Sequence, residues 1–109
     1  MEKYTRQYFP DRWEVVEIKQ NDQTYHRVLG GWLGGYTTGS AWRMSSSIEK
    51  IIDDDKHYEV SNSSGSTYFL HKGTEGLSSL TQHVLISMQD EYDIKIVDIT
   101  SLLEKYGSK

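Results

Sequence analysis

The sequence contains no cysteine, one proline (Pro10) and a single alanine (Ala41). The lack of cysteine excludes disulfide bonds and thiolate metal sites. A mainly helical protein would rarely have so little of the best helix-forming residue, whereas the β-branched and aromatic residues favoured in strands are plentiful. The composition therefore predicts a protein rich in β-structure.

Long apolar runs are also missing. No stretch approaches the roughly 20 apolar residues that a membrane-spanning helix needs. The first residues, MEKYTRQYFPDRW, lack the apolar segment of a secretory signal peptide. We therefore expect a soluble, cytoplasmic protein with no membrane partner.

Basic charge is scarce and dispersed. The formal net charge is −4, and the basic residues form only one loose group, Lys3, Arg6 and Arg12. Because sequence-independent binding of nucleic acid needs clustered cations, we expect no nucleic-acid partner.

The supply of apolar residues is small for a chain of this length. They make up 36% of the 109 residues even with tyrosine counted, against about 45–50% on a similar residue set in typical domains. Eight tyrosines and three tryptophans supply part of the missing burial. We expect a single domain, residues 1–109, and a thin core favours a homodimer or a protein partner whose interface completes the burial.

Hydrophobic periodicity predicts an α+β fold built on an antiparallel β-meander of five to six strands, as a strongly curved sheet or partial barrel. An amphipathic helix is expected over about 77–91, followed by a strand over 94–99 and a short C-terminal helix over 102–106. Ser101 and Glu104 fit a capping box for that last helix, and Gly107 would close it. Residues 1–11 are expected to form an extended N-terminal arm lying on the domain, since Pro10 disfavours helix before it. The meander strands are expected at 13–18, 24–32, 41–44, 48–52, 57–60 and 67–71.

The stretch VLGGWLGGYTTGSAW at 28–42 combines five of the nine glycines with three large rings, Trp32, Tyr36 and Trp42. Glycine permits bends, bulges and close approach of another backbone or of a ligand. The rings either complete a core that is short of aliphatic residues or form the walls of a shallow ligand pocket. Because burial is the usual role of a large ring, we favour the architectural interpretation.

The loop at 71–76 is the expected anion site, if the protein has one. A helix N-terminus offers free N–H groups to an anion, and His71 and Lys72 would add donors there. In the alternative, residues 71–76 form an ordinary strand-to-helix loop and Thr74 caps the helix. The SNSSGS stretch at 61–66 is expected to be a hairpin turn rather than a phosphate loop, because no helix follows it. Asp53 to Asp55 lack the spacing of a calcium loop, and the four histidines are isolated in sequence, so we expect no metal and no cofactor.

No catalytic residue can be named, since no nucleophile stands in a recognisable catalytic context. The segments FPDRWEVVEI, WRMSSSIEKI and SGSTYFLHK together resemble small uncharacterised proteins of phage genomes and environmental sequence sets, over about residues 8–72. The resemblance implies an accessory protein and transfers no activity.

Two functions follow from these observations. The first is a small non-enzymatic accessory or interaction protein that acts through protein–protein contacts. The alternative is a module that binds a phosphorylated or nucleotide-like molecule through Trp32, Tyr36, Trp42, His71 and Lys72.

Overall fold

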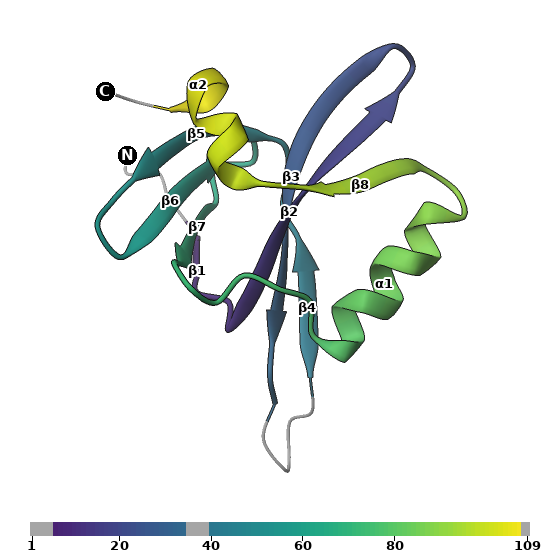
Figure 1. Cartoon of the computed structure of the whole chain (residues 1–109), viewed down its shortest axis with the longest axis horizontal. Helices are drawn as coiled ribbons and strands as arrows, with labels where there is room; N and C mark the ends of the chain where they lie inside the picture. Colours follow the sequence, from purple (N-terminus) through teal and green to yellow (C-terminus); the bar gives the residue numbers. More distant parts are fainter. Residues whose placement is uncertain (1–5, 35–39, 108–109) are drawn as a thin grey trace.

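The computed structural model describes residues 6–34 and 40–107 (Figure 1). They form mostly β-structure with two short α-helices, in agreement with the expected α+β class. Each strand of the expected meander is present, most of them extended by one or two residues at their ends. The elements are β1 (Gln7–Tyr8), β2 (Arg12–Gln20), β3 (Gln23–Trp32), β4 (Ala41–Met44), β5 (Ile48–Asp53), β6 (His57–Asn62), β7 (Thr67–His71), α1 (Ser79–Gln89), β8 (Asp93–Val97), the 3-10 helix η1 (Ile99–Leu102) and α2 (Leu103–Tyr106).

The strands form two four-stranded sheets, so the prediction of one continuous meander was wrong. Sheet A has the order β1-β7-β6-β5 and sheet B the order β4-β3-β2-β8. The chain leaves sheet B after β4, builds sheet A, and returns after α1 to add β8 beside β2. Local alternation of apolar residues predicts each strand, but it carries no information about which sheet a strand joins.

The β2–β3 hairpin has nine residue pairs and a two-residue turn. Asn21 and Asp22 both have positive φ, 52° and 64°, and Gln20 pairs with Gln23 across them. Two residues of positive φ are the signature of a type I′ turn, and Asn and Asp tolerate that conformation better than other side chains. The hairpin projects well past the rest of sheet B (Figure 1).

Sheet B is covered on both faces, so the fold has three layers: sheet A, sheet B and α1. Alternate residues of β2 point to opposite faces, so Trp13 and Val15 face sheet A while Val16 and Ile18 face α1. Figure 1 shows sheet A on one side of the central hairpin and α1 on the other. The larger core lies between the sheets and comprises Trp13, Val15, Val28, Ile48, Ile51, Tyr58, Val60, Tyr68, Leu70, Ile99 and Leu102.

Helix α1 begins two residues later than predicted, because Ser78 caps it. The Ser78 hydroxyl accepts from the Thr81 amide at 3.1 Å, and the Thr81 hydroxyl accepts from the Ser78 amide at 2.8 Å. Thr74 does not cap the helix, and its hydroxyl donates to the His71 carbonyl instead. Within α1, Leu85 is buried, whereas Ile86 is 54% exposed.

The two chain ends hold sheet A. In the described part of the N-terminal arm, β1 pairs in parallel with β7, and the Thr67 amide donates to the Arg6 carbonyl. At the other end, the predicted capping box of Ser101 and Glu104 is absent. The carboxylate of Asp98 instead accepts from the Thr100 amide at 3.0 Å and starts η1, from which α2 continues to Gly107.

Candidate functional site

Gly30 and Gly31 act by allowing close approach, not by turning the chain. Neither has a positive φ, and both are buried. A Cβ on Gly30 would lie 3.2 Å from Pro10 of the N-terminal arm, and one on Gly31 would lie 3.1 Å from the Thr81 methyl group of α1. The arm and the helix therefore clamp the end of β3 from its two faces.

The two described tryptophans of the glycine-rich stretch differ in burial. The Trp32 ring is half-buried, packs edge-on to Tyr8 at 6.3 Å between ring centroids, and donates its Nε1–H to the Phe9 carbonyl at 3.0 Å. Trp42 is 41% exposed, which contradicts its expected role as a core residue. Tyr36 lies outside the described residues.

Trp32 and Trp42 line the same hollow, which has a volume of about 510 Å³ and is called here the aromatic hollow. It is broad and open, and it lies between the N-terminal arm and the β3–β4 end of sheet B. Its volume falls within the roughly 300–1,000 Å³ typical of small-ligand sites. The full lining is Gln7, Tyr8, Phe9, Trp32, Ala41, Trp42 and Arg43.

A second hollow adjoins it, with a volume of about 240 Å³, called here the arginine–serine pocket. It shares Tyr8 and Arg43 with the aromatic hollow. Its other lining residues are Arg6, Met44, Ser45, Ser46, Ser64, Ser66 and Tyr68.

Hydrogen bonds between two serine-rich turns build this pocket. The Ser46 hydroxyl lies 2.9 Å from that of Ser64 and accepts from the Ser64 amide at 3.0 Å. The Ser64 and Ser66 hydroxyls lie 3.2 Å apart, so a short chain of hydroxyl groups runs along the pocket. The 61–66 stretch contains the predicted hairpin turn between β6 and β7. No sequence pattern indicated that this turn would meet the turn after β4.

The wall that the two hollows share carries a cationic group, Arg43. The Arg43 guanidinium carbon lies 4.7 Å from the centroid of the Tyr8 ring, and the Tyr8 and Tyr68 rings pack at 4.9 Å. None of the residues lining either hollow is acidic, although the whole chain carries a net charge of −4. The two hollows therefore form a locally positive surface on an acidic protein.

Tyr68 stays protonated in this site at neutral pH. Burial raises the pKa of Tyr68 to about 12, although the nearby Arg43 charge acts in the opposite direction.

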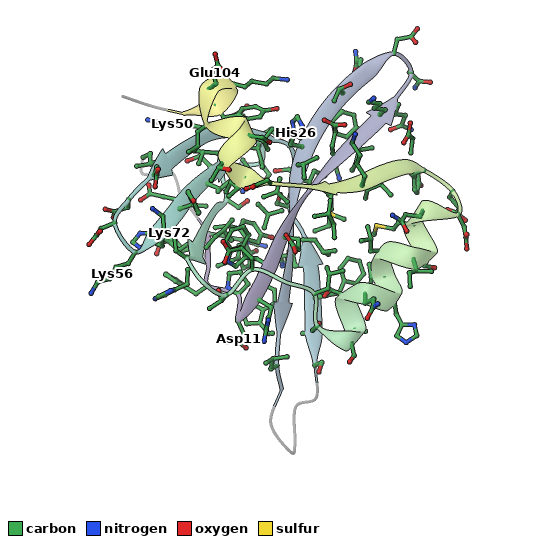
Figure 2. The ribbon with its side chains drawn as sticks, in the orientation of Figure 1. Asp11, His26, Lys50, Lys56, Lys72 and Glu104 are labelled. Carbon is green, nitrogen blue, oxygen red and sulfur yellow. The ribbon has the colours of Figure 1, made fainter. Side chains whose placement is uncertain are left out.

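His71 and Lys72 line neither hollow. The Lys72 ammonium pairs with the Asp53 carboxylate, which raises the pKa of Lys72, and it lies 4.8 Å from the Tyr58 ring centroid. Figure 2 shows Lys72 near Lys56 at the β5–β6 turn. Helix α1 begins at residue 79, and Ser78 caps its first turn. His71 and Lys72 therefore do not stand at the helix N-terminus.

A buried polar contact that sequence analysis missed links sheet B to α2. His26, 3% exposed, lies 3.2 Å from Glu17 Oε1 through Nε2 and 2.8 Å from the Tyr106 hydroxyl through Nδ1. Burial opposes ionisation of Glu17, but the His26 hydrogen bond and the Lys95 charge together lower its pKa. The ionised carboxylate only accepts, so Nε2 carries a proton and donates to Glu17; in the neutral imidazole Nδ1 then accepts from the Tyr106 hydroxyl.

This contact fastens the C-terminal helix rather than forming a site, because His26 lines neither the aromatic hollow nor the arginine–serine pocket. Figure 2 shows His26 between the hairpin and the C-terminal helix. The Glu17–His26 half of this contact could have been predicted from the hairpin register. A two-residue turn at 21–22 fixes the register that sets Glu17 opposite His26.

An acidic group surrounds Glu14, but it does not form a metal site. Burial, Glu75 and Asp98 together raise the pKa of Glu14. Among the residues that the structure describes, no three His, Asp or Glu side chains gather closely enough to hold a metal ion. Nor is any helix in residues 6–34 and 40–107 long and apolar enough to cross a membrane.

No protein-family model, curated protein or solved structure matches the chain. The resemblance to small phage and environmental proteins over about residues 8–72 therefore stays a prediction.

Proposed function

We propose that the protein binds a small organic anion that carries a flat ring, of the nucleotide-like or phosphorylated class. One observation supports this above all: an aromatic hollow and an arginine–serine pocket share the same two residues, Tyr8 and Arg43. This favours the ligand-binding alternative over the interaction protein that sequence analysis placed first, and it moves the anion-binding role from His71 and Lys72 to Arg6 and Arg43.

Each part of the site suits one part of such a ligand. The guanidinium groups of Arg6 and Arg43 match the geometry of phosphate oxygens, and hydrogen bonds of this charged kind are stronger than neutral ones. The Ser64 and Ser66 hydroxyls supply further donors. A flat ring would pack against the aromatic wall formed by Tyr8 and Trp32, where contact between rings adds to the gain from burial.

Calorimetric titration with adenosine 5′-monophosphate, adenosine and inorganic phosphate tests the proposal. The monophosphate should bind more tightly than either half, because only it fills both hollows. Replacing the central cation, Arg43→Gln, should weaken binding by about tenfold or more, as expected for loss of a charged hydrogen bond. Lys19→Gln removes an exposed cation from the far end of β2 and is the matched control.

Two results would overturn the proposal. One is the absence of measurable binding across purine and pyrimidine nucleoside monophosphates. The other is equal binding by the unmodified protein and by a folded Arg43→Gln variant.

A second candidate function is the protein–protein contact predicted from composition. Three large apolar side chains are exposed at the same end of the molecule: Phe9 (61%), Leu33 (57%) and Trp42 (41%). Exposed apolar patches commonly mark interaction sites. Measurement of the solution mass tests this candidate: a homodimer that dissociates in a Trp42→Ser variant would support it, and a monomer at high concentration would contradict self-association.

A further inference from the structure

We propose a second binding site, for a small monocarboxylate with an apolar body, on the opposite side of sheet B. Helix α1 contacts β3, β4 and β8 but does not reach the end of the β2–β3 hairpin, which projects beyond it (Figure 1). A hollow of about 340 Å³ lies where this coverage ends, and it is called here the sub-helix hollow. Its lining residues are Ile18, Gln20, Tyr25, Arg27, Met44, Met88, Tyr92 and Ile94.

Arg27 supplies the charge that selects the ligand. It stands on β3 opposite Val16, so it faces α1 with Ile18 rather than sheet A. Its guanidinium carbon lies 5.3 Å from the Tyr25 ring centroid. Its Nε is shielded from solvent and has no hydrogen-bond partner among the described residues.

No acidic residue lines the sub-helix hollow, and within the described part of the chain Arg27 forms no ion pair. The chain has more acidic than basic residues, yet in its described part none of the acidic side chains forms an ion pair with the half-buried Arg27. A bound carboxylate would accept two parallel hydrogen bonds from the planar guanidinium and balance its charge.

The rest of the lining argues for a singly charged, largely apolar ligand. Ile18, Ile94 and the two methionines form half of the lining, and methionine adapts its shape to irregular apolar ligands. One guanidinium in such a wall would leave a phosphate dianion undercompensated, whereas a monocarboxylate with a short chain or ring fits both the charge and the surface. This site and the proposed nucleotide-like site share only Met44 among their lining residues.

The methionines provide the readout. The chain has three, Met1, Met44 and Met88, so a sample labelled with ¹³C in the methionine methyl groups gives three signals. Titration with octanoate should shift Met88 and Met44 together. Octanol, which has the same apolar body without the charge, should bind about tenfold more weakly, as expected when a charged hydrogen bond is lost.

Substitutions test whether Arg27 supplies the positive charge that binds the carboxylate. Arg27→Gln should reduce octanoate affinity to the level of octanol, whereas Lys19→Gln, on the same hairpin but exposed, should leave it unchanged. The proposal is overturned if octanoate leaves Met88 unmoved, or if octanol binds the unmodified protein as tightly as octanoate does. The second comparison needs no variant and holds even if Arg27→Gln fails to fold. Adenosine 5′-monophosphate should move Met44 without Met88, which separates failure of this proposal from failure of the first.

Discussion

Substitution of Gly31 by alanine tests how tightly α1 is seated on sheet B. The added methyl group would lie 3.1 Å from the Thr81 methyl and 3.2 Å from the Ser78 hydroxyl, closer than ordinary van der Waals contact. Overpacking of this kind costs about 1–3 kcal/mol, and the lower chain entropy of alanine in the unfolded state returns about 0.4–1 kcal/mol. We expect Gly31→Ala to lower the free energy of unfolding by about 1–2 kcal/mol.

A second substitution identifies the clash. Thr81→Ser removes the offending methyl group but keeps the hydroxyl that bonds to the Ser78 amide. Alone it should cost about 1 kcal/mol, the value of one buried methyl group. In the double variant the alanine methyl occupies the vacated space, so the two costs should fall short of additivity by about 1 kcal/mol.

Urea denaturation monitored by tryptophan fluorescence measures these differences, since the ring of Trp13 is buried in the main core. Gly30→Ala is the control, because its methyl group would meet Pro10 on the opposite face of β3. Its cost should add fully to that of Thr81→Ser. A Gly31→Ala variant as stable as the unmodified protein, or a double variant with fully additive costs, would refute the close packing of α1 on Gly31.

The remaining predictions concern the C-terminal helix, the Tyr68 hydroxyl and the hairpin turn. Tyr106→Phe should lower stability by about 1–2 kcal/mol, because it removes the hydrogen bond to a buried His26 nitrogen, and Tyr92→Phe, at an exposed tyrosine, is the control. Because burial raises the pKa of Tyr68 from 10.0 to about 12, folding favours its neutral form, so its contribution is complete below pH 10 and is lost as the pH rises toward 12. Tyr68→Phe should therefore reduce the loss of stability between pH 10 and pH 12, measured by denaturation at each pH. Asp22→Gly should raise the denaturation midpoint by an amount equivalent to about 0.5–1 kcal/mol, because glycine adopts the φ of 64° without strain.

Each of these has a result that contradicts it. Equal losses in the Tyr106 and Tyr92 variants would show that the His26 contact contributes nothing specific. An alkaline transition unchanged by Tyr68→Phe would assign it to other groups. A less stable Asp22→Gly variant would mean that the Asp22 side chain, not the turn conformation, holds the hairpin.

The strands and α1 could be predicted because their signals are local. Alternation over β2 and β3, turn residues at 21–22 and spaced leucines near 80 each act within a few residues of the chain. The assignment of strands to two sheets could not be predicted, because it depends on β8 returning to β2 across most of the sequence. The predicted helix caps failed for a related reason: Thr74 and Ser101 are typical caps by type, but Ser78 and Asp98 hold the geometry that the packed chain selects.

The candidate site was only partly predictable. Trp32 and Trp42 could be singled out by their glycine neighbours. The hollow that they line, however, also needs residues 7–9 of the N-terminal arm. The arginine–serine pocket joins residues near 6, near 43 and near 64, three parts of the chain with no common sequence pattern. Lys72 stood out in the sequence because it precedes a helix, and Asp53 at the end of β5 in the same sheet neutralises it.

The two-residue strand β1 pairs with the outer edge of β7 and also places Tyr8 in the lining of the aromatic hollow. Detachment of β1 would expose the backbone N–H and C=O groups of β7, to which a strand from another molecule could pair. The same movement would dismantle the wall that Tyr8 and Phe9 give the aromatic hollow. A ligand that binds the hollow only while β1 is paired with β7 would stabilise that arrangement by mass action and so oppose self-aggregation.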